Sequence, residues 1–430
     1  MKFPAHPITR CRICHHTGLR EILSLGNQTV STFVAPGETA PVAPLTLLLC
    51  DPSTSGCGLV QLKHTSPANS LYRHYWYKSG VNASMKSALR DVAQSAVKRH
   101  PLQTGEIVLD IGANDGTLLR EFRRRDLRKI AVEPAINLTG ELSRHADTVI
   151  NDFYTHRAFI KASKGKKAAI ITTVAMFYDL EDPNSFVSDL RKSIARNGLW
   201  VNQMASLYDM VKYTMFDNVC HEHIEYYSLA ALERLLARHK FMVVDLEIND
   251  VNGGSMRVYA TPAAYAHTYV TPQSTIRLRH YRALEKTMRL EDPQTYRQFS
   301  RRVTRYKHLL HTFIAKAKTK GKTVWGYGAS TKGNTLLQYF QFNDRILAAI
   351  AERNPLKWGR VTAGTRIPIV SESAMRKAKP TYLLILPWHF RPEFIRREQA
   401  YLRGGGTMIF PLPRLSLVTM KHGKLHTTYL

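Results

Sequence analysis

Residues 106–125 read EIVLDIGANDGTLLREFRRR, and this stretch decides the fold that we expect. The apolar run 106–111 predicts a buried strand, 112–116 a glycine turn, and 117–125 a helix. A strand that enters a helix through such a turn is the repeating unit of a doubly wound parallel sheet. The glycines let the backbone approach a ligand while the N-terminus of the helix faces it.

The polar residues around this turn indicate the kind of ligand. The turn does not match G-x-G-x-x-G, the dinucleotide fingerprint. Asp110 on the first strand, followed by a glycine-rich loop, suits the cationic, phosphate-free S-adenosylmethionine. Glu133 ends the next predicted strand, where two carboxylate oxygens can accept both hydroxyls of a ribose. An ordinary turn with a solvated Glu133 is the alternative. The candidate donor-binding residues are Asp110, Gly112, Asn114, Asp115, Gly116 and Glu133.

The α/β alternation occurs twice along the chain, which predicts two such domains. Further strand candidates in the first group lie at 130–133, 168–173, 198–203 and 242–248, and those of the second at 323–327, 346–351, 367–370, 382–386 and 407–410. Between the groups, the charged, glycine-free stretch 277–318 predicts a helix that bridges two bodies. We expect a small N-terminal module at 1–68, α/β domains at 69–270 and 321–430, and a helical linker at 271–320.

Composition narrows the class of protein. The 430 residues are 44% hydrophobic and 22% charged, as in globular proteins, which argues against a disordered or fibrous chain. Lys and Arg exceed Asp and Glu by 61 to 33, and the net charge of +28 attracts phosphates, nucleic acids and anionic surfaces. The apolar runs are far shorter than the ~20 residues of a membrane span, and 1–10 lacks an apolar leader segment. We therefore expect a cytoplasmic protein without a membrane partner.

Four of the five cysteines form two pairs, Cys11-x2-Cys14 and Cys50-x6-Cys57. Four thiolates on two short knuckles match a closed tetrahedral zinc site, which is structural because no position is left for substrate. The second pair is wider than usual, so His15 or His16 could replace one sulfur. Four buried free thiols are the alternative.

A dense polar cluster, CHEHIEYY, occupies 220–227. It does not match the zinc protease motif H-E-x-x-H. In an extended segment His221 and His223 would share one side, with Glu222 opposite. A histidine with a pKa near 6.5 suits removal of a proton from carbon beside a carbonyl. Satisfied surface histidines are the alternative.

The second α/β domain has its own glycine turn at 326–334, GYGASTKGN. Backbone amides, two hydroxyls and a lysine at a helix N-terminus form an anion cradle, although the segment matches neither a P-loop nor a dinucleotide fingerprint. A capped turn is the alternative. The loops at 352–359 and 387–389 follow other strands and lie on the same ligand-binding edge.

Taken in order, these segments resemble the S-adenosylmethionine-dependent C-methyltransferases that act on nucleotide-linked keto-deoxysugars. The resemblance covers nearly the whole chain. It rests on the cysteine module, YWYKSG at 75–80, VLDIGANDG at 108–116, VEP at 132–134, HEHIEYYS at 221–228, GGSMRV at 253–258, and 326–334 with PWH at 387–389.

The resemblance implies an α/β enzyme in three parts. A zinc module would help to close the cleft, a class I Rossmann-like domain would bind S-adenosylmethionine, and a second Rossmann-like domain would hold the nucleotide diphosphate. Methyl transfer to C3 of a 4-keto-deoxyhexose would pass through an enolate, with His223 as base, Glu222 as its acidic neighbour, and Tyr77 near the sugar. His221 is the fourth candidate catalytic residue. Candidate substrate-binding residues are Tyr75, Lys78, Asn252, Ser330, Thr331, Lys332, Asn334, Asn354, Lys357 and Trp388.

Other functions stay open at this stage. An RNA or DNA methyltransferase would fit the charge, but the basic segments 120–129 and 161–167 lack interleaved aromatic residues. A methyltransferase acting on another small molecule, or a nucleotide-sugar-binding protein that has lost catalysis, are further alternatives. The intact His223 and Glu133 argue against the last. The sequence predicts neither the nucleotide, the sugar, nor the oligomeric state.

Overall fold

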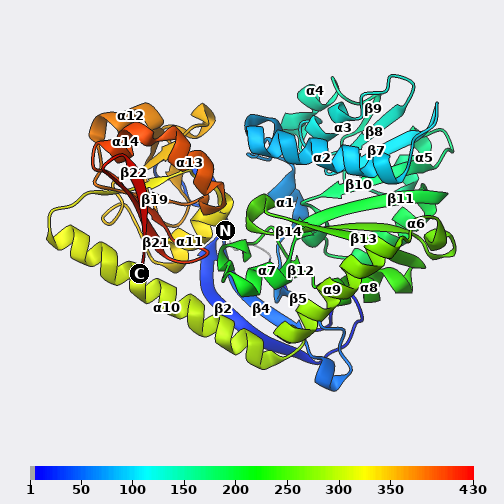
Figure 1. Cartoon of the computed structure of the whole chain (residues 1–430), viewed down its shortest axis with the longest axis horizontal. Coiled ribbons are helices and arrows are strands. Elements are labelled where there is room, and N and C mark those ends of the chain that lie inside the picture. Colours follow the sequence, from blue (N-terminus) through cyan, green and yellow to red (C-terminus); the bar gives the residue numbers. More distant parts are fainter. Residues whose placement is uncertain (1–4) are drawn as a thin grey trace.

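The computed structural model describes residues 5–430. Two α/β bodies, drawn from cyan to green and from yellow to red in Figure 1, lie on either side of the blue strands of the N-terminal module. In this part of the chain, no helix combines the length and apolarity needed to cross a bilayer.

The N-terminal module is built on a four-stranded antiparallel sheet that borrows one strand from the middle body. Its strands are β2 (Leu19–Thr29), β4 (Val42–Cys50) and β5 (Val60–Leu62), and β12 (Glu225–Tyr226) completes the order β12-β5-β4-β2. A second pairing joins β3 (Phe33–Val34) to β17 (Val361–Thr362) of the C-terminal body. The module therefore connects both α/β bodies through backbone hydrogen bonds.

The middle body contains the predicted doubly wound sheet, with strand order β13-β14-β11-β10-β7-β8-β9. Six strands are parallel, and β14 inserts antiparallel between β11 and β13. Every residue of β7 is buried, as expected for a central parallel strand covered on both faces. The strands are β7 (Ile107–Ile111), β8 (Arg128–Val132), β9 (Thr148–Ile150), β10 (Ala168–Val174), β11 (Ile194–Ala205), β13 (Phe241–Asn249) and β14 (Ser255–Pro262).

Helices on both faces of this sheet explain its apolar composition. Successive β7 side chains point to opposite faces, so Val108 packs with Leu89 and Val92 of α2 (Ala83–Arg99), whereas Leu109 joins the other core. The first crossover helix, α3 (Thr117–Glu121), is shorter than the predicted 117–125. The other helices of this body are α5 (His156–Ala162), α6 (Pro183–Ser193), α7 (Leu207–Lys212) and α8 (Leu229–Arg238).

The C-terminal body repeats the architecture with the order β18-β16-β15-β19-β20-β21-β22. Its first five strands are parallel and the last two form an antiparallel edge that the sequence had not indicated. The bounds are β15 (Val324–Tyr327), β16 (Ile350–Glu352), β18 (Ile369–Ser371), β19 (Tyr382–Ile385), β20 (Thr407–Phe410), β21 (Ser416–Lys421) and β22 (Lys424–Tyr429), with helices α11 (Thr331–Tyr339), α12 (Glu372–Ala378), α13 (Arg391–Arg397) and α14 (Gln399–Arg403).

The predicted single helix at 277–318 is in fact two, α9 (Pro272–Met288) and α10 (Pro293–Thr319). Arg289 adopts a left-handed φ of 57° and ends α9. The Asp292 side chain accepts the amide of Gln294, and Pro293 occupies the first turn, where its missing N–H costs nothing. Figure 1 shows α10 running beneath the module from one body to the other, so the bridging role holds.

Candidate active site

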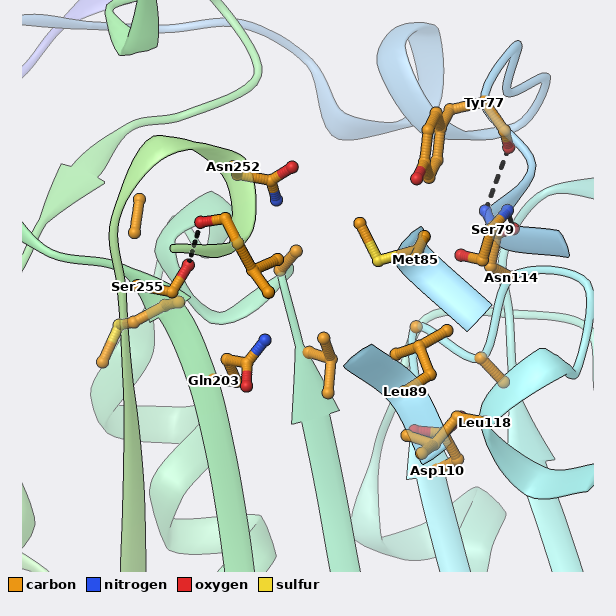
Figure 2. Close-up of a pocket in the computed structure, with 17 residues that line it drawn as sticks. Tyr77, Ser79, Met85, Leu89, Asp110, Asn114, Leu118, Gln203, Asn252 and Ser255 are labelled. Atoms are coloured by element: carbon orange, nitrogen blue, oxygen red, sulfur yellow. Dashed lines mark hydrogen bonds between the residues drawn. The ribbon is translucent and has the colours of Figure 1, made fainter. Parts of the chain in front are cut away.

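Two adjoining cavities open at the carboxyl ends of the parallel strands. The larger has a volume of about 900 Å³ and is lined by all three parts of the chain. The smaller, of about 80 Å³, lies within the middle body between β7, β10, β11 and α2 (Figure 2). Their common wall is formed by Tyr77, Ser79, Gly112, Asn114, Val174, Ala175 and Asn252.

The glycine turn after β7 forms one side of the smaller cavity. Gly112 has a φ of 72°, and a Cβ there would lie 3.0 Å from Met176 Cγ, so the turn needs glycine for both conformation and space. Asp110 lines the cavity and accepts the hydroxyl of Thr172 at 2.6 Å. Its burial raises the pKa of Asp110 to about 7.

Glu133 follows β8 and fixes the turn. One carboxylate oxygen accepts the amide of Asn114 and the other that of Ala135, both at 2.8 Å. Each oxygen keeps a second acceptor site, and Glu133 lines the larger cavity, so the carboxylate can still accept a ribose diol. Among the described residues that line the smaller cavity there is no Lys or Arg, which suits a cationic ligand without phosphate. These residues fit S-adenosylmethionine.

Two of the predicted donor-binding residues support the turn without lining either cavity. Asp115 accepts the amide and hydroxyl of Thr117 with one oxygen and the Gly80 amide, at 2.7 Å, with the other. Gly116 caps α3 with a φ of 80°. Asp115 thereby ties the 75–80 segment, which carries Tyr77, to the glycine turn.

The 220–223 segment is a tight turn, so the predicted extended arrangement is wrong. The His223 amide donates to the Cys220 carbonyl at 3.2 Å, which closes the turn. Glu222 and His223 line the larger cavity together. His221 instead points into the N-terminal module, where its Nε2 donates to the Ala43 carbonyl at 3.0 Å, and it is 3% exposed.

The tautomer of His223 is set by its surroundings. Its Nδ1 lies 2.9 Å from the Asn218 carbonyl oxygen, which can only accept, so Nδ1 carries the proton and Nε2 the free lone pair. Burial and the charge of Lys332 lower the pKa of His223 to about 3. The imidazole is therefore neutral and able to accept a proton at neutral pH.

Acidic and phenolic groups surround this histidine. Burial raises the pKa of Glu222 to about 7, and the Tyr75 hydroxyl lies 3.4 Å from its Oε2. Although Tyr77 is 39% exposed, desolvation and the charge of Asp115 raise its pKa to about 12, so its hydroxyl stays protonated as a donor. Asp179, which sequence reasoning missed, is half-buried and lines the same cavity, with its pKa raised well above the usual range by desolvation and by Glu222.

In the C-terminal body, the predicted cradle caps α11. The Ser330 hydroxyl accepts the Gly333 amide at 3.0 Å, and Ser330, Thr331 and Lys332 all line the larger cavity. Burial lowers the pKa of Lys332, whose charge also lowers the pKa of His223 and of His389. Lys332 therefore lies within electrostatic reach of the base as well as at the cradle.

The remaining predicted substrate residues divide into two groups. Lining the larger cavity are Tyr75, Lys78, Asn252, Asn354 and Lys357. Trp388 and Asn334 line neither cavity. The Trp388 indole donates to Asp217 at 2.8 Å, and the Asn334 amide donates to the Thr32 carbonyl, so both hold the bodies together rather than face a ligand.

Sequence reasoning assigned no role to several further residues that line the larger cavity. They are Phe33, Asp179, Glu352, Arg353, His389 and Arg397. For Glu352 a signal existed, because it ends the second strand of its body just as Glu133 does. Arg353 and His389 lie in the loops 352–359 and 387–389 that the sequence placed at the ligand-binding edge, whereas Phe33 and Arg397 reach the cavity through the packing of distant segments.

The four predicted metal ligands meet at one point of the N-terminal module. The sulfurs of Cys11, Cys14, Cys50 and Cys57 all lie within 4.8 Å of one another, and two Sγ–Sγ pairs are 3.5 Å apart. A tetrahedral zinc with bonds of about 2.3 Å would separate its sulfur ligands by about 3.8 Å, so the four thiols fit zinc without His15 or His16.

Comparison with known proteins gives three family matches along the chain. Family models match residues 11–72 as a zinc binding domain, 82–246 as a methyltransferase domain, and 250–413 as a C-methyltransferase C-terminal domain. The C-methyltransferase NovU of Streptomyces niveus is 30% identical over 420 residues, covering 96% of this chain and 97% of its own.

Solved structures that match part of this chain include the following two methyltransferases. Magnesium protoporphyrin IX methyltransferase of Synechocystis with bound S-adenosylmethionine has a TM-score of 0.31 at 12% identity, covering 41% of this chain and 78% of its own. The N-methyltransferase NodS of Bradyrhizobium japonicum has a TM-score of 0.32 at 11% identity, covering 42% and 97%.

Proposed function

This chain belongs to the C-methyltransferase family, and from this premise we propose that it methylates C3 of a nucleotide-linked 4-keto-deoxyhexose. It is a methyltransferase that uses S-adenosylmethionine and holds zinc in its N-terminal module. The proposal concerns the acceptor, the methylated carbon and the base.

The observation that carries the proposal is the position of a neutral histidine in the larger cavity. His223 lines this cavity with its Nδ1 proton held by the Asn218 carbonyl, so Nε2 is the free basic nitrogen. Tyr77 lines both cavities and stands where the bound methyl donor and the acceptor would meet. A base beside a junction of two ligand cavities is what carbon methylation next to a ketone requires.

The chemistry follows from the acidity of the acceptor. His223 Nε2 removes the proton from C3, and the electron pair of the C–H bond moves into the enolate of the C4 ketone. The enolate oxygen needs a hydrogen-bond donor, for which we propose Tyr77 and protonated Glu222. S-adenosylmethionine, when bound, supplies a methyl group on a sulfonium, which the nucleophilic C3 accepts. A placed base contributes ~10²–10⁴-fold to such a step.

We place the nucleotide diphosphate at the C-terminal cradle. Ser330, Thr331 and Lys332 offer hydroxyls and a cation at the N-terminus of α11. In a hexose, C3 lies only two bonds from the C1 that carries the diphosphate, so the phosphate site and the base must be neighbours. The electrostatic effect of Lys332 on His223 supports this arrangement. A bound diphosphate would offset the ammonium charge and raise the pKa of His223 toward a more useful value.

The test is solvent deuterium exchange at C3, measured with the nucleotide-keto-sugar bound and with S-adenosylhomocysteine in place of the donor. We expect His223→Ala to bind both ligands and to lose exchange and methyl transfer together, by ~10²-fold or more. His221→Ala is the matched control, because His221 lies on the same loop but outside both cavities.

Two outcomes would contradict the proposal. Exchange and transfer near wild-type rates in His223→Ala would assign the base to another group. Exchange that persists while transfer is lost would make His223 a positioning residue. Failure of any nucleotide-linked keto-sugar to bind would overturn the acceptor class itself.

A further inference from the structure

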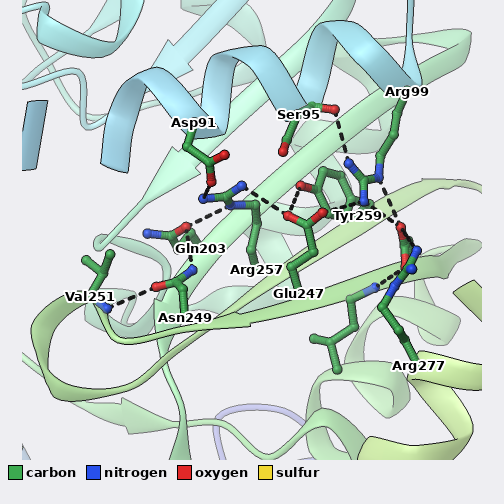
Figure 3. A network of polar contacts seen from close by, with 12 residues as sticks. Asp91, Ser95, Arg99, Gln203, Glu247, Asn249, Val251, Arg257, Tyr259 and Arg277 are labelled. Atoms are coloured by element: carbon green, nitrogen blue, oxygen red, sulfur yellow. Dashed lines mark hydrogen bonds and ion pairs between the residues drawn. The ribbon is translucent and has the colours of Figure 1, made fainter. Parts of the chain in front are cut away.

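A network of charged residues underlies the smaller cavity, and its centre is a buried arginine (Figure 3). Arg257 on β14 is 1% exposed. Its guanidinium contacts Asp91 of α2 at 2.8 Å and Glu247 of β13 at 3.1 Å. Further ion pairs join Arg99 to Glu247 and to Asp245. The mechanism proposed above does not use any of these groups.

The network reaches the cavity through Gln203 of β11. Arg257 Nε donates to Gln203 Oε1 at 2.8 Å, and Asn249 Nδ2 donates to the same oxygen at 3.2 Å. Asn249 is itself fixed, since its Oδ1 accepts the Val251 amide at 3.1 Å. Two donors on one oxygen settle the orientation of the amide, because the flipped amide would direct its own donors at them.

The amide nitrogen of Gln203 is left for the cavity. Gln203 is 2% exposed and lines the smaller cavity, and Figure 2 shows its nitrogen directed into that space. With its oxygen occupied, the side chain can only donate there. Asp110, on β7 two strands away, offers an acceptor to the same cavity. A cavity with a donor on one strand and a carboxylate on another suits the zwitterion of an α-amino acid.

We propose that the Gln203 amide binds the carboxylate of the methionyl end of S-adenosylmethionine, and that Arg257 is the positioning residue that turns the amide toward it. A donor group selects the carboxylate over the ammonium. This assignment rests on the donor site and not on the identity of the acceptor sugar.

The experiment compares ligands that share the adenosine half of the donor. Binding is measured by calorimetry for S-adenosylhomocysteine and for 5′-methylthioadenosine, which lacks the amino-acid end. Gln203→Glu keeps an oxygen for Arg257 and Asn249 but replaces the cavity donor by an acceptor. We expect this substitution to weaken the binding of S-adenosylhomocysteine about 10- to 100-fold and to leave the affinity for 5′-methylthioadenosine within about twofold of wild type.

Controls separate this contact from general damage. Glu133→Gln alters the ribose contact, so it should weaken both ligands alike. Arg257→Lys removes the Nε contact and should produce a smaller selective loss; if this variant fails to fold, Asn249→Ala removes the other donor and takes its place. Decarboxylated S-adenosylmethionine tests the carboxylate alone, and wild-type preference for S-adenosylmethionine over it should disappear in Gln203→Glu.

Equal losses for both ligands in Gln203→Glu, or unchanged S-adenosylhomocysteine binding, would overturn the inference. So would a preference over the decarboxylated donor that survives the substitution. Absence of binding to wild-type protein would count against the donor site itself, which is a separate failure.

Discussion

The glycine turns of the two α/β bodies share one frame. In the middle body Glu133 accepts the amides of Asn114 and Ala135, both at 2.8 Å. In the C-terminal body Glu352 accepts the amide of Ala329 at 2.7 Å and that of Asn354 at 2.8 Å. Each glutamate follows or ends the second strand, and holds one amide of the turn and one amide two residues beyond itself.

The charged side chains near the two turns have opposite signs. Asp110 lies under the first turn, and the described lining of that cavity includes no Lys or Arg. The second turn carries Lys332, and Lys357 donates to its Ala329 carbonyl at 2.8 Å. One backbone design can thus serve a cationic sulfonium or an anionic diphosphate, and the charge near the turn decides between them.

Zinc removal should have the largest effect, and it should affect both α/β bodies. The reason is that the N-terminal module pairs with both bodies through β5–β12 and β3–β17. We expect Cys11→Ser with Cys14→Ser, or chelation, to lower the thermal midpoint by roughly 10 °C and to weaken both ligands together. Metal analysis and calorimetric melting check this. Unchanged zinc content and stability in the double variant would refute a structural zinc.

Replacing each of the two glutamates by glutamine should show whether the two turns bind different ligands. Glu133→Gln is expected to weaken S-adenosylhomocysteine by about 10-fold or more, through loss of charge-assisted hydrogen bonds worth ~1.5–3 kcal/mol, with the substrate KM unchanged. Glu352→Gln is the matched variant and should do the reverse, raising the substrate KM by a similar factor.

Calorimetry and steady-state kinetics on both variants provide the measurement. If both variants weakened the same ligand, the two turns would not be separate sites. If Glu352→Gln affected neither ligand, its role would be limited to holding its own loop.

The smallest expected effect is a pH dependence of turnover that arises from Glu222 on the acceptor side. His223, with a pKa near 3, is already unprotonated above pH 5 and gives no acid limb. Glu222, with a pKa near 7, is protonated below that pH and loses its donor proton above it. We expect kcat/KM to fall as pH rises through about 7, by up to about 10-fold per unit, whereas ionisation of Asp110, whose pKa is also near 7, should strengthen donor binding over the same range.

Glu222→Gln keeps a hydrogen-bond donor without titrating, so it should remove this limb. If the fall in kcat/KM near pH 7 persists in Glu222→Gln, another group causes it. If kcat/KM also falls below about pH 6.5 in the wild type and this fall vanishes in His223→Ala, the low pKa of His223 is contradicted.

The sequence was most informative where the decisive interactions are local. The 106–111 run predicted β7 within one residue, and 407–410 predicted β20 in full. The cysteine spacing predicted a set of thiols that meet. Apolar patterning and metal-ligand spacing both act over a few residues, so they can be read from one segment.

The errors arose where distant segments decide. His221 and His223 were placed on one face, but pairing of β12 with β5 and the turn at 220–223 separate them. Trp388 was assigned to substrate, but Asp217 provides its partner. The break between α9 and α10 is the exception, because its signal, Asp292-Pro293, is local. The site residues assigned by resemblance remain predictions that the proposed variants test.

The pairing of the N-terminal module also has a consequence for biosynthesis. Domains generally fold as they leave the ribosome, the first before the last. Here β5 pairs with β4 early but obtains its second neighbour, β12, only when 225–226 have been made, and β3 waits for 361–362. The earliest segment translated therefore completes its sheets late, and we expect nascent chains released before residue 362 to expose unpaired strand edges to chaperones.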